Sequence, residues 1–340
     1  MKEKFDFNDI LIQMSITSPI NSRRKEVKNI YKDGKLPLFA SPMDTVVGYK
    51  NYKKYLNSNI NVCLPRGEKK IKGKFVFNSY SLTDIENIIK GNDKLVGKCV
   101  LIDIANGHMV KLEKMTKELK EKFPDITLMV GNIANVKTYR KLSVAGADFI
   151  RVGIGFGSGC LTTEKTGCGY PMASLIHECY NEKCKMGDSG KVGAKIVADG
   201  GFKKEADIIK ALALGADYVM LGGIFNKALE SSGSNYIFKH IKVNEQIAKY
   251  AFKNGLKVKK KFRGMATKDV QRKWGNKILK TSEGVKRINS VEYTLNSWVE
   301  NFSDYLKSSM SYTGSRNLGE FIGKVKFNLI TNESYKRFNK

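Results

Sequence analysis

One cysteine lies in a segment whose composition is typical of a loop that presents a nucleophile. Residues 153–163 contain four alternating glycines, then Cys160, and end on two threonines. Glycine lets the backbone adopt conformations that other residues avoid, so such a loop can hold a thiol beside an electrophilic carbon. Its closely spaced carbonyl oxygens can also bind a monovalent cation. A core cysteine needs no such loop, so Cys160 is the candidate nucleophile, although no histidine adjoins it in the sequence.

The other cysteines lack this context. None forms a Cys-x-x-Cys pair, and with only three histidines the chain shows no zinc-ligand pattern. The amino-terminal residues contain no apolar run typical of a secretory signal. We therefore expect reduced thiols in a cytoplasmic protein. The residues interpreted as small core side chains are Cys63, Cys99, Cys168, Cys179 and Cys184.

Two glycine pairs follow segments that have the character of buried strands. Gly200-Gly201 comes directly after Asp199, and Gly222-Gly223 ends the apolar segment 218–222. The loops after the last two strands of a barrel often bind phosphate through backbone amides. Both pairs fit that role, and Asp199 would then bind sugar hydroxyls. Ordinary strand-end turns explain the same glycines about equally well.

The order of the elements predicts the fold class. Short apolar segments alternate with helix-like stretches such as 108–122 and 134–145, and Gly146 and Gly215 each end a helix before a buried strand. Eight segments are apolar on both faces, as parallel strands covered by helices should be, and they span 36–41, 60–64, 75–79, 99–104, 127–131, 149–153, 195–199 and 218–222. The pattern predicts an α/β fold, a (β/α)8 TIM barrel, with a doubly wound sheet as the alternative.

The rest of the chain has a different character. Residues 226–300 are polar and rich in lysine, so we expect a partly mobile flap inserted after the last strand. Residues 301–323 have an apolar helical face that would close the barrel, and residues 324–340 are a basic tail. No linker divides the chain, which predicts one catalytic domain over residues 1–340.

Charge bears on the class of partner. Lysine and arginine total 60 against 33 acidic residues, which gives a formal charge of +27. Most of these cations are lysines, whereas base and phosphate recognition favours arginine. A nucleic-acid partner is therefore less favoured than an ordinary lysine-rich surface, which would still attract phosphorylated small molecules. No apolar run is long enough for a membrane helix.

The glycine-rich loop also carries a family resemblance. Residues 155–162 and their continuation 166–171 are similar to the catalytic loop of the IMP dehydrogenase/GMP reductase family, and the resemblance extends from residue 7 to about residue 314. It implies a TIM barrel that binds a purine nucleotide beside a nicotinamide dinucleotide.

Several segments resemble the reductase branch more closely. These are residues 103–107, the Gly-Tyr-Pro that ends at Pro171, and Gly222-Gly223. The chain also shows neither the paired regulatory domain that most dehydrogenases insert nor their Arg-Tyr dipeptide. Residues 263–265, Arg-Gly-Met, resemble the dehydrogenase instead. Three further positions depart from the family pattern, namely Gly159, Thr163 and Met172.

The resemblance implies reductive deamination of GMP to IMP and ammonia with NADPH. Cys160 would attack purine C2 and form a covalent thioimidate, while Thr162 and Glu283 would relay the proton that ammonia needs. A minimal IMP dehydrogenase and a non-catalytic relative that binds nucleotides or nucleic acid remain alternatives.

Further site residues follow from the resemblance alone, as does an expected homotetramer. Substrate contacts are expected from Ser41, Met43, Asp199, Gly200, Gly201, Gly222, Gly223, Gly264, Met265 and Ala266. Cofactor contacts are expected from Ser22, Arg23, Arg66, Asp103, Ile104, Ala105, Ile154 and Gly155. Potassium or another monovalent cation is expected at the carbonyl oxygens of Gly155, Gly157 and Cys160.

Overall fold

A closed barrel of eight parallel strands forms the centre of the molecule. The computed structural model describes residues 3–157, 159–238, 241–265, 267–273 and 284–338. Each barrel strand pairs with the next along the chain, and the last pairs with the first. The strands are β2 (Leu38–Ala40), β3 (Asn61–Leu64), β4 (Val76–Tyr80), β5 (Cys99–Asp103), β6 (Thr127–Ile133), β7 (Phe149–Val152), β8 (Lys195–Asp199) and β9 (Tyr218–Leu221).

The barrel confirms the predicted fold class. Each of the eight predicted segments contains or overlaps one barrel strand. Because the sheet closes on itself, the alternative of a doubly wound open sheet is wrong. One connection departs from strict alternation: β3 and β4 are joined by residues 65–75, all of which are described and none of which is helical.

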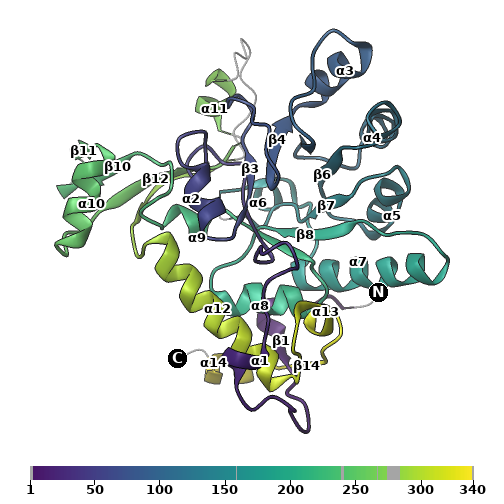
Figure 1. The fold of residues 1–340 in the computed structure, drawn as a ribbon, viewed down its shortest axis with the longest axis vertical. Coiled ribbons are helices and arrows are strands. Elements are labelled where there is room, and N and C mark those ends of the chain that lie inside the picture. The colour runs from purple at the N-terminus through teal and green to yellow at the C-terminus, as the bar shows by residue number, and fades with distance from the viewer. Residues whose placement is uncertain (1–2, 158, 239–240, 266, 274–283, 339–340) are drawn as a thin grey trace.

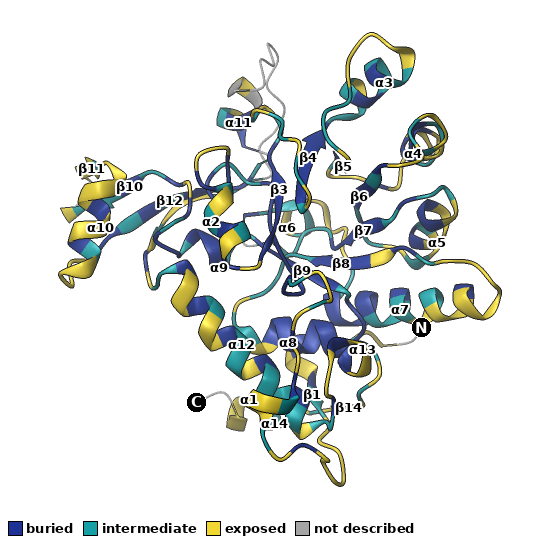
Figure 2. Ribbon diagram, in the orientation of Figure 1, coloured by how far each residue is buried: buried dark blue, intermediate teal, exposed yellow. Residues whose placement is uncertain are grey.

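Helices cover the outside of the barrel (Figure 1). They are α2 (Tyr52–Asn57), α3 (Leu82–Lys90), α4 (Val110–Lys122), α5 (Val136–Val144), α7 (Met172–Asp188), α8 (Glu205–Ala213) and α12 (Leu295–Tyr312). Figure 2 shows α8 buried along most of its length, whereas α3, α4 and α5 turn exposed faces outward. The beginning of α3 illustrates the local cause: Ser81 Oγ accepts the amide of Asp84 at 3.1 Å, and the Asp84 carboxylate accepts the amide of Ser81 at 2.8 Å.

The strands separate two apolar cores. Side chains alternate across a strand with a period of two, so one set faces the helices and the other fills the barrel. The inner set is made of Phe39, Cys63, Phe77, Cys99, Leu101, Met129, Phe149, Val197, Tyr218 and Met220. The same period places the last inward residue of most strands in a separate layer at the carboxyl end, where polar groups and glycines replace apolar side chains.

The segment after β9 forms a lobe with its own sheet rather than an irregular loop. Its four antiparallel strands lie in the order β11-β10-β12-β13, and Figure 1 shows the lobe projecting to the left of the barrel. Its elements are α9 (Gly223–Asn226), β10 (Asn235–Ile237), β11 (Ile241–Val243), α10 (Glu245–Lys253), β12 (Lys259–Arg263), α11 (Lys268–Lys273) and β13 (Lys286–Ser290). Alternation along these strands buries one face against α10, where Val258 and Ala251 are part of a small third core. The excursion is thus a folded unit attached to the barrel.

Two strands near the ends of the chain pair with each other below the barrel in Figure 1. β1 (Ile10–Ile12) pairs antiparallel with β14 (Phe327–Leu329), and α14 (Asn332–Phe338) follows. The segment predicted as a basic tail therefore contains a strand and a helix, because the amino-terminal segment offers β14 a pairing edge that no local pattern reveals. α1 (Arg23–Glu26) and α13 (Leu318–Phe321) lie at the same end.

Among the described residues, no helix is long and apolar enough to cross a membrane.

The glycine that ends α8 provides a test of the fold. Gly215 has φ +113°, and a Cβ there would lie 2.2 Å from Tyr180 Cγ. Gly255 follows α10 at the equivalent position with φ +76°, but no described heavy atom lies within 4 Å of its Cβ position. We expect Gly255→Ala to lower the free energy of unfolding by about 1 kcal/mol through backbone strain. Gly215→Ala should cost about 1–3 kcal/mol more through overpacking.

Urea denaturation of both variants and the wild-type chain measures the difference. Equal midpoints for the two variants would contradict the packing of Gly215 against Tyr180.

Candidate functional site

The carboxyl end of the barrel carries a buried ion-pair network inside the strands. Arg151 of β7 donates from Nη1 to Asp103 of β5 at 2.6 Å, and from Nη2 to Asp199 of β8 at 2.7 Å. Its side chain is only 7% exposed. Burial opposes its charge, but the two carboxylates outweigh that effect and raise the pKa of Arg151 above its usual value. The network fixes the ends of three strands relative to one another.

Gly131 of β6 leaves the space that the Arg151 side chain needs to reach Asp103. Asp103, Gly131 and Arg151 lie side by side on three adjacent strands. A Cβ on Gly131 would approach Arg151 Cβ to 2.6 Å, so a larger residue would block the path of Arg151 towards Asp103. Asn132, the next residue, donates from Nδ2 to Asp199 Oδ2 at 2.7 Å. Gly131 is thus the small residue between two larger ones, Asp103 and Arg151, on neighbouring strands.

The candidate nucleophile lies beside a hydroxyl group. The thiol of Cys160 donates to Thr162 Oγ1 at 3.2 Å, and Thr162 begins the short helix α6 (Thr162–Thr166). The Cys160 amide donates to the Gly157 carbonyl at 2.7 Å, which closes a tight turn before the thiol. Cys160 is half-buried, whereas Cys63, Cys99 and Cys179 are buried. Cys168 and Cys184 are exposed, so the interpretation as core side chains is wrong for these two. Burial raises the pKa of the Cys179 thiol well above its usual value.

The lobe contacts the glycine-rich loop that carries Cys160 (residues 153–163, hereafter the thiol loop) through three glycines. Cys160 forms an isolated antiparallel bridge with Gly284, and the amide of Val285 donates to the Gly159 carbonyl at 3.1 Å. Gly264, which follows β12, donates to the Val285 carbonyl at 2.9 Å. A Cβ on Gly264 would lie 2.1 Å from the Gly159 oxygen. A Cβ on Gly159 would in turn lie 3.1 Å from Gly264 Cα, which gives a physical reason for glycine at position 159, one of the three departures from the family pattern.

Thr163, another departure, packs against the beginning of the loop. A Cβ on Gly155 would lie 1.8 Å from Thr163 Oγ1, and that hydroxyl donates to the Cys168 carbonyl at 2.8 Å. Met172, the third departure, is buried at the beginning of α7 against Gly153.

The predicted phosphate segments lie against the thiol loop and the loop after β2. A Cβ on Gly200 would approach the amide nitrogen of Gly157 to 3.0 Å, and one on Gly201 would approach Phe156 Cβ to 3.2 Å. On the other side, a Cβ on Gly222 would lie 2.7 Å from Met43 Sδ. Both glycine pairs are therefore positions of close approach.

Two further predicted substrate residues adjoin these segments. The amide of Ser41 donates to the Leu221 carbonyl at 3.1 Å, which sets Ser41 beside Gly222. Gly223 is the first residue of α9, and Met265 follows Gly264. The structure thus gathers the described substrate residues around the carboxyl end of the barrel.

The predicted cofactor residues fall into two groups. Arg66 lies 3.5 Å from Asp103, as measured from Nε to Oδ2. Ile104 and Ala105 continue from Asp103, and Ile154 is half-buried in the thiol loop. Asp103 connects this group to Arg151 at the carboxyl end of the barrel.

The second group lies elsewhere. The Ser22 amide donates to Glu26 at 2.8 Å, and Arg23 donates from Nη1 to Ser308 of α12 at 3.2 Å. Within one chain, Ser22 and Arg23 belong to the α1–α12 side of the barrel.

Two predicted residues, Glu283 and Ala266, lie outside the described residues.

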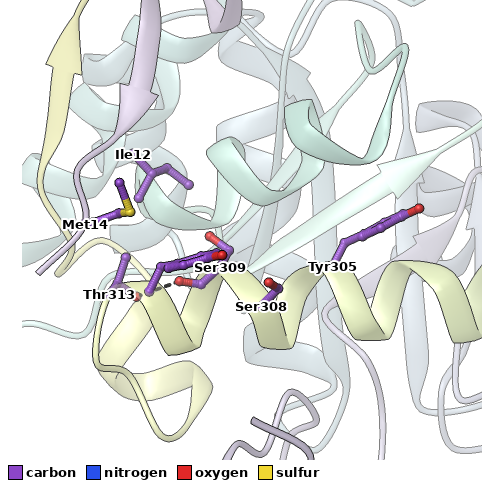
Figure 3. A pocket seen from close by; sticks show the side chains of 7 residues that line it. Ile12, Met14, Tyr305, Ser308, Ser309 and Thr313 are labelled. Atoms are coloured by element: carbon purple, nitrogen blue, oxygen red, sulfur yellow. Dashed lines mark hydrogen bonds between the residues drawn. The ribbon is translucent and has the colours of Figure 1, made fainter. Parts of the chain in front are cut away.

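Two shallow pockets lie on the described surface, one on the β1–α12 side of the molecule and one beside the loop that carries Cys160. One, of about 280 Å³, is formed by Ile12, Met14 and one face of α12, including Tyr305 and Ser308 (Figure 3). The other, of about 340 Å³, lies between the amino-terminal segment and the thiol loop, with Lys4 and Asp6 facing Phe156 and Thr163. Neither has Cys160 in its lining.

Sequence reasoning did not single out Arg151 or Asn132. A signal for Arg151 was present, because it is a charged residue at an inward position of an otherwise apolar strand. Asn132 follows a glycine at a strand end, which is weaker information. The link between Arg263 and Asp44 was also missed, since these residues are 219 positions apart.

Two proteins of known name are similar to this chain in sequence. An inosine-5′-monophosphate dehydrogenase of Staphylococcus aureus is 30% identical over 336 residues, which cover 94% of this chain and 63% of that protein. The enzyme of the same name from Staphylococcus haemolyticus is 35% identical over 231 residues, which cover 66% of this chain and 45% of that protein. The chain thus spans between 45% and 63% of the length of these relatives.

A family model described as the IMP dehydrogenase / GMP reductase domain matches residues 85–338. Because the match runs from α3 to α14 and includes the thiol loop, the chain belongs to the IMP dehydrogenase/GMP reductase family.

Proposed function

We propose that this protein is an NADPH-dependent GMP reductase, which converts GMP into IMP and ammonia. The observation that carries the proposal is the thiol of Cys160, held 3.2 Å from Thr162 Oγ1 in a loop that the lobe contacts at Gly284. A half-buried thiol beside a proton acceptor, at the carboxyl end of a barrel, suits nucleophilic attack on a bound ligand.

The sulfur of Cys160 acts on purine C2. Thr162 Oγ1 accepts a hydrogen bond from the thiol and passes the thiol proton on to Glu283, and the thiolate adds to C2 of GMP. The C2–N bond then breaks as the amino group leaves as ammonia, which forms a thioimidate between Cys160 and the purine. When NADPH is bound, it would supply the hydride that C2 receives. The C2–S bond finally breaks, so the thiolate is regenerated and IMP is released.

Ammonia departs only if its nitrogen is protonated, because an amide anion is a very poor leaving group. Thr162 and Glu283 are proposed to move this proton. The support for Glu283 is its place in the chain directly before Gly284, the residue that bridges to Cys160.

The nucleotide is proposed to bind between the two glycine pairs and the lobe. Gly200-Gly201 and Gly222-Gly223 expose backbone amides to the phosphate. Asn132 and Arg151 both donate to Oδ2 of Asp199, so Oδ1 would accept a ribose hydroxyl. Gly264, Met265 and Ala266 would contact the base from the lobe, with Ser41 and Met43 opposite.

NADPH is proposed to bind beside the purine nucleotide, on the side of the site that Arg66 and Asp103 form. Arg66 provides a cation for a phosphate, and Asp103 a carboxylate for ribose hydroxyls. The residues that would hold NADPH are Arg66, Asp103, Ile104, Ala105, Ile154 and Gly155. A second copy in a homotetramer would have to supply Ser22 and Arg23, since these lie on the α1–α12 side of their own chain.

Carbonyl oxygens of Gly155, Gly157 and Cys160 would hold potassium, because oxygen ligands suit hard cations. Support comes from the tight turn that joins two of these three residues, in which the Cys160 amide donates to the Gly157 carbonyl.

A minimal IMP dehydrogenase is the second candidate. It is favoured by the relatives named inosine-5′-monophosphate dehydrogenase and by Arg263-Gly264-Met265. It would use the same thioimidate and release it with water. The reductase is preferred on the pattern of residues 103–107, the Gly-Tyr-Pro ending at Pro171, and Gly222-Gly223.

Absorbance of the reduced nicotinamide separates these functions. We expect loss of NADPH absorbance with GMP and release of ammonia. Formation of NADH from IMP and NAD⁺ with accumulation of XMP would instead establish the dehydrogenase. Absence of turnover in both assays would contradict both enzymes and favour a non-catalytic nucleotide- or nucleic-acid-binding relative.

The Cys160→Ala variant should lose turnover while still binding GMP. The reason is that alanine removes the sulfur but leaves the glycine pairs intact. The measurement is steady-state NADPH oxidation together with calorimetric titration of GMP. The matched control is Cys168→Ala, which removes the exposed thiol eight positions later. Wild-type rates in Cys160→Ala would remove Cys160 from the mechanism.

The Glu283→Gln variant should fail at ammonia departure and spare hydride transfer. Glutamine cannot shuttle a proton as a carboxyl group does, so turnover of GMP should be crippled. Oxidation of IMP by NADP⁺ to the covalent adduct releases no ammonia, so a single-turnover burst of NADPH should survive. Stopped-flow absorbance measures this burst, with Cys160→Ala as the negative control. If the burst is lost as completely as in Cys160→Ala, Glu283 is no dedicated acid for the ammonia step.

A further inference from the structure

An ion pair that the mechanism does not use joins the lobe to the barrel. Arg263, the last residue of β12, donates from Nε to Asp44 Oδ1 at 3.2 Å and from Nη2 to the other oxygen of the same carboxylate. The side chains of Arg263 and Asp44 are 14% and 7% exposed. Two-point contact between a guanidinium and a carboxylate fixes orientation as well as distance.

The Arg263–Asp44 pair lies next to two segments that are proposed to bind the nucleotide. Arg263 directly precedes Gly264, which contacts Gly159 and Gly284. Asp44 directly follows Met43, whose Sδ lies against Gly222. The pair therefore connects the proposed base-binding segment of the lobe to the loop that borders the proposed phosphate segment.

A second contact joins the same two segments independently. Asn226, which ends α9, is fully buried and donates from Nδ2 to the Thr45 carbonyl at 2.8 Å and to the Lys261 carbonyl at 3.1 Å. Its Oδ1 accepts from Asn289 of β13 at 2.8 Å. Asn226 thus anchors the barrel side of the lobe, and the Arg263–Asp44 pair is the contact nearer to Gly264.

The charge environment of Arg263 supports a fixed geometry. The Asp44 carboxylate is the main cause that holds the pKa of Arg263 above its usual value. Asp269 of α11 lies 3.9 Å from Arg263 Nη1 and pairs more closely with Lys286, at 2.7 Å. Lys286 therefore neutralises Asp269, and Asp44 remains the principal partner of Arg263.

We propose that Arg263 is a positioning residue for the purine nucleotide: through Asp44 it sets the separation between Gly264-Met265 on the lobe and Met43–Gly222 on the barrel. This inference rests on the proposed function, because it assumes that a purine nucleotide bridges those two sides. A nucleotide that contacts both sides binds only when their spacing matches its length. The dinucleotide side, formed by Arg66 and Asp103, has no part in this pair.

Calorimetric titration in the Cys160→Ala background tests the inference without turnover. We expect Arg263→Ala to raise the Kd for GMP and IMP at least about tenfold, while the Kd for NADPH changes less than about twofold. Asp44→Asn should give a similar rise. The double variant with Arg263→Ala and Asp44→Asn should have a nucleotide Kd little higher than either single variant, since both changes break the same interaction. Arg263→Lys keeps the charge and should recover part of the affinity.

Lys249→Ala is the matched control, because it removes an exposed cation from α10 of the same lobe, where Lys249 pairs with Glu245 and not with Asp44 or Asp269. Unchanged nucleotide Kd in Arg263→Lys and Asp44→Asn would overturn the inference, as would an equal loss for NADPH or for Lys249→Ala. If Arg263→Ala does not fold, Arg263→Lys and Asp44→Asn decide the same question. Failure of the starting protein to bind either nucleotide would instead refute the proposed function, so the two failures are distinct.

Discussion

The site depends on one buried cation inside the barrel. Arg151 is surrounded by β-strands, and its charge is stable there only because Asp103 and Asp199 share it. Removing either carboxylate would take away the acceptor of one guanidinium nitrogen in a region from which water is largely excluded. The three residues therefore constrain one another, and they hold the carboxyl ends of β5, β7 and β8 in a fixed relation. Asp199 and Asp103 are also the carboxylates proposed to face the two ribose groups, so the network orients both.

Glycines make close contacts possible around this centre. Gly131 leaves the path that Arg151 uses to cross β6, and Gly159 and Gly264 let the thiol loop and the lobe meet through their backbones. Side chains at these positions would push apart the segments that surround Cys160. Gly155 serves a different contact, since the Thr163 hydroxyl occupies the space that a Cβ would need. The glycine-rich composition of the loop thus reflects packing as well as access to the thiol.

The lobe gives the site its second side. Its sheet is anchored to the barrel by Asn226 and reaches the thiol loop through Gly284 and Val285. Arg263 adds a charged contact at the end of β12, near Gly264. A ligand at the carboxyl end of the barrel would therefore be bordered by two folded units, whose relative position depends on a small number of polar contacts.

The sequence by itself determined the barrel and the location of the thiol loop. Runs that are apolar on both faces predict parallel strands wherever they occur, and glycines such as Gly146 and Gly215 mark helix ends because their φ values, +98° and +113°, are unfavourable for other residues. These signals are local, so β2 to β9 could be identified without a structure. The ion pairs Arg151–Asp103 and Arg263–Asp44, the sheet of the lobe and the β1–β14 pairing were decided only by the tertiary structure. In the two ion pairs and in the β1–β14 pairing, the partners lie far apart in the chain, and β10 pairs with β12 across α10. A local pattern carries information only about neighbours in the sequence, so it could not indicate these contacts.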